Sequence, residues 1–242
     1  MGSVASLAAW QAALRDSERL DDLQYAGRRI IQNTETTCFS LDAVLLARFA
    51  RIKRGDHVLE LGTGAGVIPL LIARDDLTID AVEIDPVMAE LAMRNVRLNG
   101  LADCVRVRTG DFRATEGLGK RGSFDCVLSN PPWYPLGQGK IGRAARAHHE
   151  ITATLADAAA AARHALRFGG RFALVHVPAR LDELFFALKE NGMAARRLQF
   201  FAPRMDAAPR FVLVEAVVGA SVGALTVLPP LLGDAAQAEK EA

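Results

Sequence analysis

The sequence predicts an α/β fold, a doubly wound and mostly parallel sheet of seven strands with an antiparallel hairpin at its edge. From residue 56 onward, short apolar runs alternate with helical patterns, which is typical of a parallel sheet covered by helices on both faces. A glycine-rich turn joins the first strand to the first helix of this series. Two strand-like runs near the C-terminus lie close together, which favours an antiparallel pair.

The composition limits the possible classes of protein. A chain of 242 residues with 50% hydrophobic and 24% charged residues can bury a core and remain soluble as one domain with extensions. Lys and Arg number 29 against 28 Asp and Glu, so any affinity for nucleic acid must come from local patches. The three cysteines, Cys38, Cys104 and Cys126, lack the spacing of metal ligands and are expected to be buried free thiols in a reducing compartment. Because we find no signal peptide and no membrane-spanning run, we expect a cytoplasmic protein with no membrane partner. The His-His-Glu run at residues 148–150 could suggest a metal site, but adjacent side chains on a helix point apart, so we expect a helix start there and no metal.

Residues 1–50 are expected to form a helical or extended N-terminal segment. Leu7, Trp10, Leu14 and Leu20 are loosely spaced as in a helix, and residues 27–32 suggest a strand or an extended arm. Residues 39–49 predict a helix with Ser40 and Asp42 as capping residues; the alternative is that these two side chains help to line the mouth of a pocket. The main domain would then cover residues 51–233, and residues 234–242 would be a flexible tail.

The main domain is expected to contain seven strands and four helices. Short apolar runs bounded by turn residues predict the strands, and a period near 3.6 predicts the helices. The expected strands are residues 57–61, 78–84, 105–108, 124–128, 171–177, 197–201 and 210–218. The expected helices are residues 67–74, 86–99, 151–166 and 181–188, the third ended by Gly169 and Gly170.

The turn after the first strand predicts a cofactor site formed by Glu60, Gly62, Thr63, Gly64 and Gly66. Glycines at alternate positions let the backbone turn sharply and approach a ligand at the end of a parallel strand. The third glycine comes one position earlier than in the Gly-x-Gly-x-x-Gly dinucleotide fingerprint. This difference favours S-adenosylmethionine, although nicotinamide and flavin proteins use a similar turn.

Acidic residues follow the next two strands. Glu83 ends the second strand, where a carboxylate can accept hydrogen bonds from both ribose hydroxyls of the cofactor. Asp85 precedes Pro86 and is interpreted as the N-cap of the next helix. Asp111 can accept from the amino group of the cofactor's adenine while Phe112 flanks the ring, although Asp111 is also consistent with an ordinary turn residue.

The stretch from Asn130 through Pro131 and Pro132 to Trp133 ends the fourth strand. Neither proline can donate to a sheet, so the strand must stop there in a stiff turn. The Asn130 oxygen and the Pro131 carbonyl could accept from an exocyclic amino group, and the indole could stack on its ring. The alternative is a rigid turn with a core tryptophan.

Together, the glycine loop and this turn make the chain similar to the amino-methylating branch of the S-adenosylmethionine-dependent methyltransferases, whose signature is Asn/Asp-Pro-Pro-aromatic. Residues 39–43, 177–181 and 228–231 extend the resemblance to the bacterial family that methylates an anticodon-loop adenine of a valine tRNA. The resemblance implies the Rossmann-like class I methyltransferase fold and S-adenosylmethionine as cofactor. It also implies that the catalytic residues are Asn130, Pro131, Pro132 and Trp133, that Asn130 contacts the cofactor as well, and that the substrate is a tRNA or another RNA.

The segment after the turn predicts a substrate-binding surface. Tyr134 could help to stack the base, and Lys140, Arg143 and Arg146 lie in a glycine-containing run without an acid that could contact phosphates. An ordinary exposed loop is the alternative. A wider basic track is also considered, formed by Arg28, Arg29, Arg196, Arg197, Arg204 and Arg210.

Three other functions remain open. A protein glutamine methyltransferase acting on a translation factor can use the same turn on a side-chain amide, and a DNA adenine methyltransferase can use it on a base. A non-catalytic RNA-binding or assembly protein could retain the cofactor fold.

Overall fold

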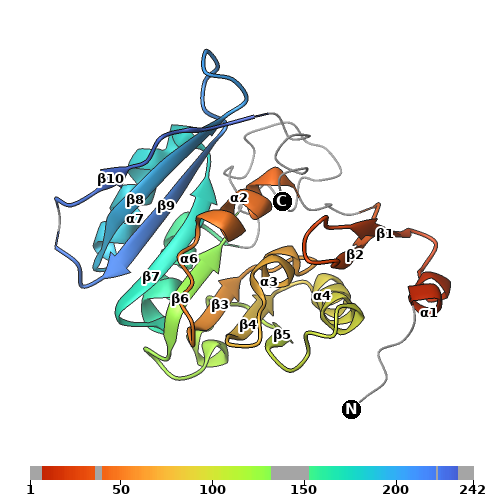
Figure 1. The fold of residues 1–242 in the computed structure, drawn as a ribbon. Coiled ribbons are helices and arrows are strands. Elements are labelled where there is room, and N and C mark those ends of the chain that lie inside the picture. The colour runs from red at the N-terminus through yellow and green to blue at the C-terminus, as the bar shows by residue number, and fades with distance from the viewer. Residues whose placement is uncertain (1–6, 36–39, 132–152, 222, 234–242) are drawn as a thin grey trace.

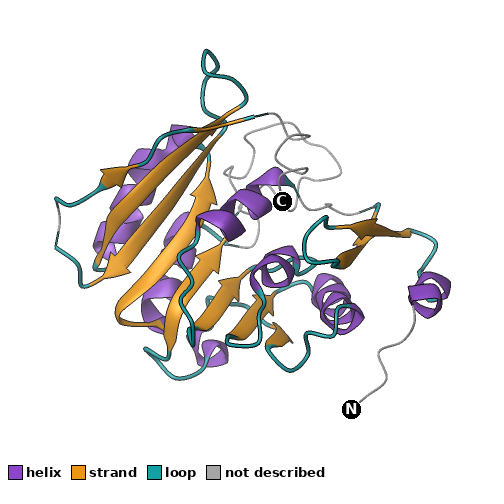
Figure 2. Ribbon diagram, viewed as in Figure 1, coloured by secondary structure: helices purple, strands orange, loops and turns teal. Residues whose placement is uncertain are grey.

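The computed structural model describes residues 7–35, 40–131, 153–221 and 223–233. They form three layers, with a central sheet between two layers of helices (Figures 1 and 2). Among the described residues, no helix is both long and apolar enough to cross a membrane.

The strands form one large sheet and one separate hairpin. The large sheet has the order β10-β8-β9-β7-β6-β3-β4-β5, with β11 also paired to β8. Its strands are β3 (His57–Leu61), β4 (Thr78–Glu83), β5 (Val105–Thr109), β6 (Phe124–Ser129), β7 (Leu166–His176), β8 (Met193–Ala202), β9 (Phe211–Val218), β10 (Thr226–Val227) and β11 (Leu231–Leu232). The separate hairpin pairs β1 (Glu18–Asp22) with β2 (Arg29–Asn33).

The apolar side chains of the strands pack into two cores, one on each face of the sheet, and helices cover both cores. On one face, Val58 and Leu128 pack with α2 (Leu41–Phe49), α3 (Val67–Ile72) and α4 (Pro86–Leu98). On the other face, Leu59 and Val127 pack with α6 (Leu155–Ala165) and α7 (Leu181–Glu190). Successive strand residues point to opposite faces, so the runs that enter both cores are apolar throughout. The remaining helical elements of the described residues are α1 (Leu7–Ala12), η1 (Thr115–Leu118) and η2 (Pro178–Arg180).

The predicted parallel sheet is confirmed, together with the antiparallel pairing of its last two long strands. β9 pairs antiparallel with both β7 and β8, and the other pairs between long strands are parallel. The predicted number of strands was wrong, because the sheet has nine strands among the described residues: β10 and β11 both pair with β8 and cover parts of its outer edge. The Gln199 side chain also donates to the Pro229 carbonyl between these two strands, at 2.9 Å.

Two local predictions were wrong. The N-terminal helical pattern yields only the short helix α1, and residues 18–22 form β1 because they pair along their whole length with β2. The helix before β7 ends at Ala165, and Gly169 and Gly170 lie inside β7, where they do not form a helix end. A Cβ on Gly170 would lie 2.9 Å from the carbonyl oxygen of Arg167, so this irregular part of the strand requires a glycine.

The described cysteines, Cys104 and Cys126, are free thiols, as predicted, but Cys104 is only half-buried. Cys126 is buried within β6, and burial raises the pKa of its thiol to about 12. Cys38 lies outside the described residues.

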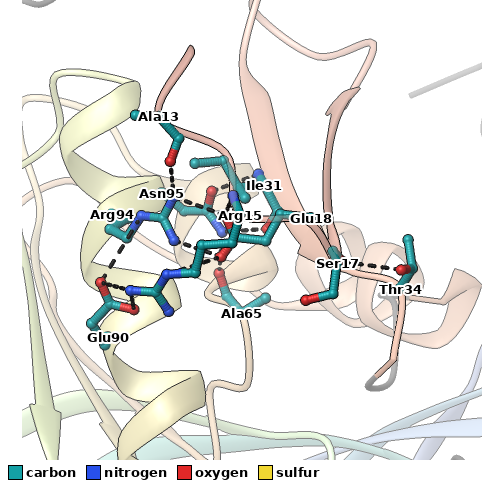
Figure 3. Close-up of polar contacts among 10 residues, drawn as sticks. All are labelled: Ala13, Arg15, Ser17, Glu18, Ile31, Thr34, Ala65, Glu90, Arg94 and Asn95. Atoms are coloured by element: carbon teal, nitrogen blue, oxygen red, sulfur yellow. Dashed lines mark hydrogen bonds and ion pairs between the residues drawn. The ribbon is translucent and has the colours of Figure 1, made fainter. Parts of the chain in front are cut away.

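The N-terminal hairpin is attached to α4 by two asparagine side chains that imitate a neighbouring strand (Figure 3 shows Asn95). The Asn95 amide accepts from Ile31 N at 2.6 Å and donates to Ile31 O at 3.0 Å. One helical turn later, the Asn99 amide accepts from Arg29 N at 2.9 Å and donates to Arg29 O at 2.7 Å. Residues four apart share one face of a helix, and alternate residues of a strand share one edge, so the two spacings match.

Charged side chains reinforce this attachment (Figure 3). Arg94 donates to both carboxylate oxygens of Glu18, at 2.6 and 2.9 Å, and to the carbonyl oxygen of Ala13 at 3.3 Å. Arg15 pairs with Glu90 at 3.1 Å. Burial acts to raise the pKa of Glu18, but the hydrogen bonds from Arg94 and from the Arg15 backbone outweigh it and hold that pKa below its ordinary value.

We expect Asn95→Ala to destabilise the fold more than Asn99→Ala. Asn95 is completely buried and also donates to Ala65 O at 2.9 Å, so its loss leaves three buried backbone groups without this partner. Leaving one such group unsatisfied costs about 1–3 kcal/mol. Asn99 is half-buried and serves as the matched control. Urea denaturation measures the free energy of unfolding of both variants. Equal losses would contradict the prediction that Asn95 contributes more to stability than Asn99.

A second prediction concerns Glu60 of β3, whose side chain is 1% exposed. Burial raises its pKa from 4.5 to about 8; the hydrogen bond from Thr63 acts in the opposite direction, and the Glu83 charge adds to the rise. Between these pH values the folded state holds a proton that the unfolded state has lost, so the free energy of unfolding falls as the pH rises. The slope approaches about 1.4 kcal/mol per pH unit.

Glu60→Gln should remove this contribution to the slope. We expect the difference in unfolding free energy between wild type and Glu60→Gln to change by roughly 2–3 kcal/mol between about pH 5.5 and 7.5, to the disadvantage of the wild type at high pH. Urea denaturation at both pH values is the measurement. Parallel pH profiles of the two proteins would rule out a buried proton at Glu60.

Candidate active site

The candidate site lies where β3, β4, β5 and β6 end. Leu61 is level with Val82 of β4 and with Ser129 of β6, and Glu83 is level with Thr109 of β5. Parallel strands lie about 4.8 Å apart, so the turns that follow them leave the sheet side by side. The predicted glycine loop, Glu83 and Asn130 are therefore brought together, and Asp111 lies one strand farther out.

The glycine loop follows β3 and has the backbone conformation that its glycines allow. Gly62, Gly64 and Gly66 have φ values of 75°, 55° and 85°. A Cβ on Gly66 would also lie 3.2 Å from the Cβ of Ala92, so Gly66 lets α4 pack directly against the loop. The bond from Asn95 to Ala65 O ties the loop to the same helix. The loop is therefore a fixed backbone surface.

Glu83 connects the loop to the end of β4. One carboxylate oxygen accepts from Gly64 N at 2.8 Å and the other from Asp85 N at 3.0 Å. Each carboxylate oxygen has two acceptor sites, so both can still accept from a pair of ligand hydroxyls. The sequence did not reveal that Glu83 also orients the loop.

Asp85 is the N-cap of α4, as predicted, and accepts from Val87 N at 2.8 Å. Beside Glu83, Ile84 is 39% exposed and Val87 is 53% exposed. Exposed aliphatic side chains next to a carboxylate suit a ligand with one apolar face and neighbouring hydroxyls. We did not predict either residue, although their positions after an acidic strand end were a usable signal.

Glu60 and Thr63 lie beneath the loop. The Thr63 hydroxyl donates to the Glu60 carboxylate, and both residues are buried. At neutral pH the Glu60 carboxyl can itself act as a donor, because its raised pKa keeps it largely protonated. Their predicted contact with a cofactor stays a prediction.

Asp111 and Phe112 follow β5. The Gly110 N–H donates to Glu83 O at 2.8 Å, which brings this turn next to Glu83. The Arg113 side chain donates hydrogen bonds of 2.6 to 3.0 Å to the Asp111 carboxylate. These hydrogen bonds hold the pKa of Asp111 below its ordinary value. Phe112 is half-buried against the core that contains α6. A ligand contact of Asp111 would have to share the carboxylate with Arg113.

Asn130 follows the end of β6, and its side chain contacts Asp42, which we had interpreted as a capping residue of α2. Its Nδ2 donates to Oδ2 of Asp42 at 2.5 Å, across 88 positions of the sequence. The other oxygen of Asp42 accepts from the Ser40 hydroxyl. Neither side chain caps α2: Ser40 occupies the N-cap position without a side-chain capping bond, and Asp42 is 1% exposed beneath the site. The capping interpretation was therefore wrong.

Pro131 is buried and is the last described residue of the predicted catalytic turn. The other predicted residues of this turn and of the substrate surface lie outside the described residues: Pro132, Trp133, Tyr134, Lys140, Arg143 and Arg146. Within the described ranges, no three His, Cys, Asp or Glu side chains are grouped as metal ligands would be.

The wider basic track is interrupted by internal contacts. Arg28 donates to the carbonyl oxygens of Leu70 and Ala73 at the end of α3. Arg197 pairs with Glu215 at 3.2 Å and lies over the Phe49 ring. These arginines act inside the fold, so they do not form a continuous phosphate-binding surface.

Comparison with known proteins places this arrangement in a family. The sequence model of the methyltransferase small domain matches residues 40–184. A tRNA1(Val) (adenine(37)-N6)-methyltransferase from a Flavobacteriaceae bacterium is 30% identical over 123 residues, which cover 50% of this chain and 52% of that protein. A protein of the same name from Parabacteroides distasonis is 28% identical over 180 residues, covering 72% and 74%. The chain thus spans about half to three quarters of the length of these curated relatives.

The structural comparison concerns the fold. The crystal structure of a predicted O-methyltransferase from Agrobacterium tumefaciens superimposes with a TM-score of 0.63 at 24% identity, covering 79% of this chain and 86% of that one. This likeness confirms the predicted class I methyltransferase fold. Since the family model matches more than half of the sequence, the chain belongs to the methyltransferase small domain family.

Proposed function

We propose that this protein is an S-adenosylmethionine-dependent methyltransferase that methylates the exocyclic amino nitrogen of adenine in RNA, most specifically in the anticodon loop of a tRNA. The observation that supports this best is the pairing of an oriented Asn130 amide at the end of β6 with a glycine loop and Glu83 on the neighbouring strands. The names of the curated relatives support the choice of adenine and of tRNA.

The residues at the site fit the cofactor. Glu83 would accept from the ribose hydroxyls with its remaining acceptor sites, and Ile84 and Val87 would offer apolar surface to the adenine. The loop from Gly62 to Gly66 would cradle the rest of the molecule. S-adenosylmethionine, when bound, supplies a methyl group already activated on a sulfonium.

The protein would mainly position the acceptor. The Asn130 oxygen and the Pro131 carbonyl would accept from the two hydrogens of the amino group, which draws the nitrogen lone pair out of conjugation with the ring. Forming the N–C bond while the bond between methyl and sulfur breaks would leave the donor as a neutral thioether and the nitrogen positively charged and acidic, and the nitrogen would then lose one proton to solvent. Stacking on Trp133 and Tyr134 would hold the base, and Lys140, Arg143 and Arg146 would contact the RNA backbone. We place this reaction in the cytoplasm.

The division of the chain at residue 50 stays a prediction. Asp42 lies before this boundary and contacts Asn130 on the other side of the boundary. The helix α2 would therefore contribute to the catalytic domain, although α2 precedes that domain in the sequence.

We expect Glu83→Gln to weaken cofactor binding by roughly tenfold, because an amide can accept through only one of its two ends. Asp85→Ala is the matched control: it removes the cap of α4, which costs about 1 kcal/mol of stability, and leaves the Glu83 carboxylate in place. Calorimetric titration with S-adenosylmethionine measures both variants. Equal affinity of Glu83→Gln and wild type would remove Glu83 from the cofactor site.

The function itself is tested by incubating the protein with tritiated S-adenosylmethionine and unmodified tRNA, total RNA, DNA or protein, followed by nucleoside or amino-acid analysis. We expect label in N6-methyladenosine of tRNA. Label in glutamine or in DNA adenine would instead establish the corresponding alternative.

In the same assay, Asn130→Ala should lower methyl transfer about 10²–10³-fold, the range for removing one preorganised polar group from a transition state. Cofactor affinity should stay nearly unchanged. Asn191→Ala, which removes a side chain bonded to Ala187 O at the end of α7, serves as the control and should keep full activity. Full turnover by Asn130→Ala would refute the catalytic assignment.

A further inference from the structure

We propose that Asp42 is a positioning residue that fixes the amide of Asn130 with its oxygen toward the acceptor nitrogen. The inference rests on the proposed function for the chemistry of the acceptor, an amino group. Asp42 lies in the first turn of α2, on the opposite side of the predicted domain boundary from Asn130. It does not need to touch the substrate to have this effect.

Both carboxylate oxygens of Asp42 accept hydrogen bonds within the described part of the chain. Its side chain is 1% exposed, and a buried carboxylate is unfavourable unless its oxygens are hydrogen-bonded. Here one oxygen accepts from the Ser40 hydroxyl and the other from Asn130 Nδ2. A carboxylate that only complemented the dipole of α2 could remain in solvent. The burial of Asp42 therefore points to Asn130 as the group that it serves.

The direction of the Asn130 amide follows from this contact. An ionised carboxylate can only accept, so the amide nitrogen must face Asp42; the reverse orientation would place two acceptors against each other. The amide is planar, which directs its oxygen away from Asp42. An amino group whose lone pair is delocalised into a ring acts only as a hydrogen-bond donor. If the Asn130 amide were rotated by 180°, it would present its own NH2 donor to that amino group and could not bind it.

The charge of Asp42 adds a second effect. Methyl transfer from a sulfonium to a neutral amine moves positive charge onto the amine nitrogen. In the chain from Asp42 through Asn130 to this nitrogen, each hydrogen bond polarises the next, and low solvent exposure limits screening. The carboxylate would therefore stabilise the charge that develops during the reaction.

Three substitutions separate positioning from general stability. Asp42→Ala removes both hydrogen bonds. Asp42→Asn removes the charge but keeps both contacts: its oxygen can accept from Asn130, and its NH2 group can donate to the Ser40 hydroxyl oxygen. Asp80→Ala is the control: it removes a carboxylate that bonds His57 Nε2 at 2.9 Å, near the opposite end of the sheet.

We expect Asp42→Ala to lower kcat about 10²-fold, with the KM values for cofactor and acceptor within roughly threefold of wild type. Asp42→Asn should recover kcat to within about tenfold of wild type, because it restores the orientation without the charge. Asp80→Ala should change stability without changing kcat. A wild-type kcat in Asp42→Ala, or an Asp42→Asn variant as slow as Asp42→Ala, would overturn the proposal. If the alanine variant does not fold, Asp42→Leu provides a side chain of similar shape without hydrogen bonds.

The variants are assayed on whichever acceptor the wild type methylates, so a wrong assignment of adenine in RNA would leave this test intact. A second measurement needs no acceptor. The side-chain amide protons of Asn130, assigned in NMR spectra by their absence from Asn130→Ala, should exchange with solvent roughly tenfold faster in Asp42→Leu than in wild type. Unchanged exchange would show that Asp42 does not hold the amide and would overturn the proposal whatever the substrate is.

Discussion

The parallel pairing of β3 with β4 on one side and with β6 on the other is the constraint on which the site depends. It places the ends of three buried strands at one level, with the glycine loop between Glu83 and Asn130. Two strand spacings separate these side chains, about 10 Å. A cofactor on the loop can therefore contact Glu83 at one end and present its reactive group near Asn130 at the other, without movement of the sheet.

The acidic side chains at the two ends of the sheet have different kinds of partner. At the end where β3 begins, Asp56 pairs with Arg171, Asp80 with His57, and Asp125 with Arg167. At the end that carries the site, Asp42, Glu60 and Glu83 are held by hydroxyl, amide and backbone donors and make no ion pair with Lys or Arg in the described part of the chain. Asp111, one strand farther out, is paired with Arg113. Glu60 is largely protonated at neutral pH, because burial raises its pKa to about 8, so it adds little charge. The carboxylates of Asp42 and Glu83 leave a local negative potential that suits a ligand carrying a sulfonium.

The sequence predicted the sheet well because strands buried on both faces are apolar throughout: the predicted starts of β3, β4, β5 and β6 coincide with the observed starts. It missed β1, whose sequence Glu-Arg-Leu-Asp-Asp has little apolar character and forms a strand only through its pairing with β2. The glycine loop and Glu83 were found because they adjoin strand ends in the sequence. The contact between Asp42 and Asn130 could not be found in this way, since it arises only when α2 packs beside the end of β6 and brings together residues 88 positions apart.

The attachment of the N-terminal hairpin makes it part of the same structural unit as the site. An isolated two-stranded hairpin is marginally stable in water, and an open strand edge invites pairing with other chains. Asn95 and Asn99 occupy positions along the open edge of β2, and the same Asn95 amide that bonds Ile31 also holds the carbonyl of Ala65 in the glycine loop. The loop is therefore held from one side by Glu83 and from the other by a buried amide whose orientation depends on the hairpin. Residues before the sheet thus contribute to the site twice, through β2 to the loop and through α2 to Asn130.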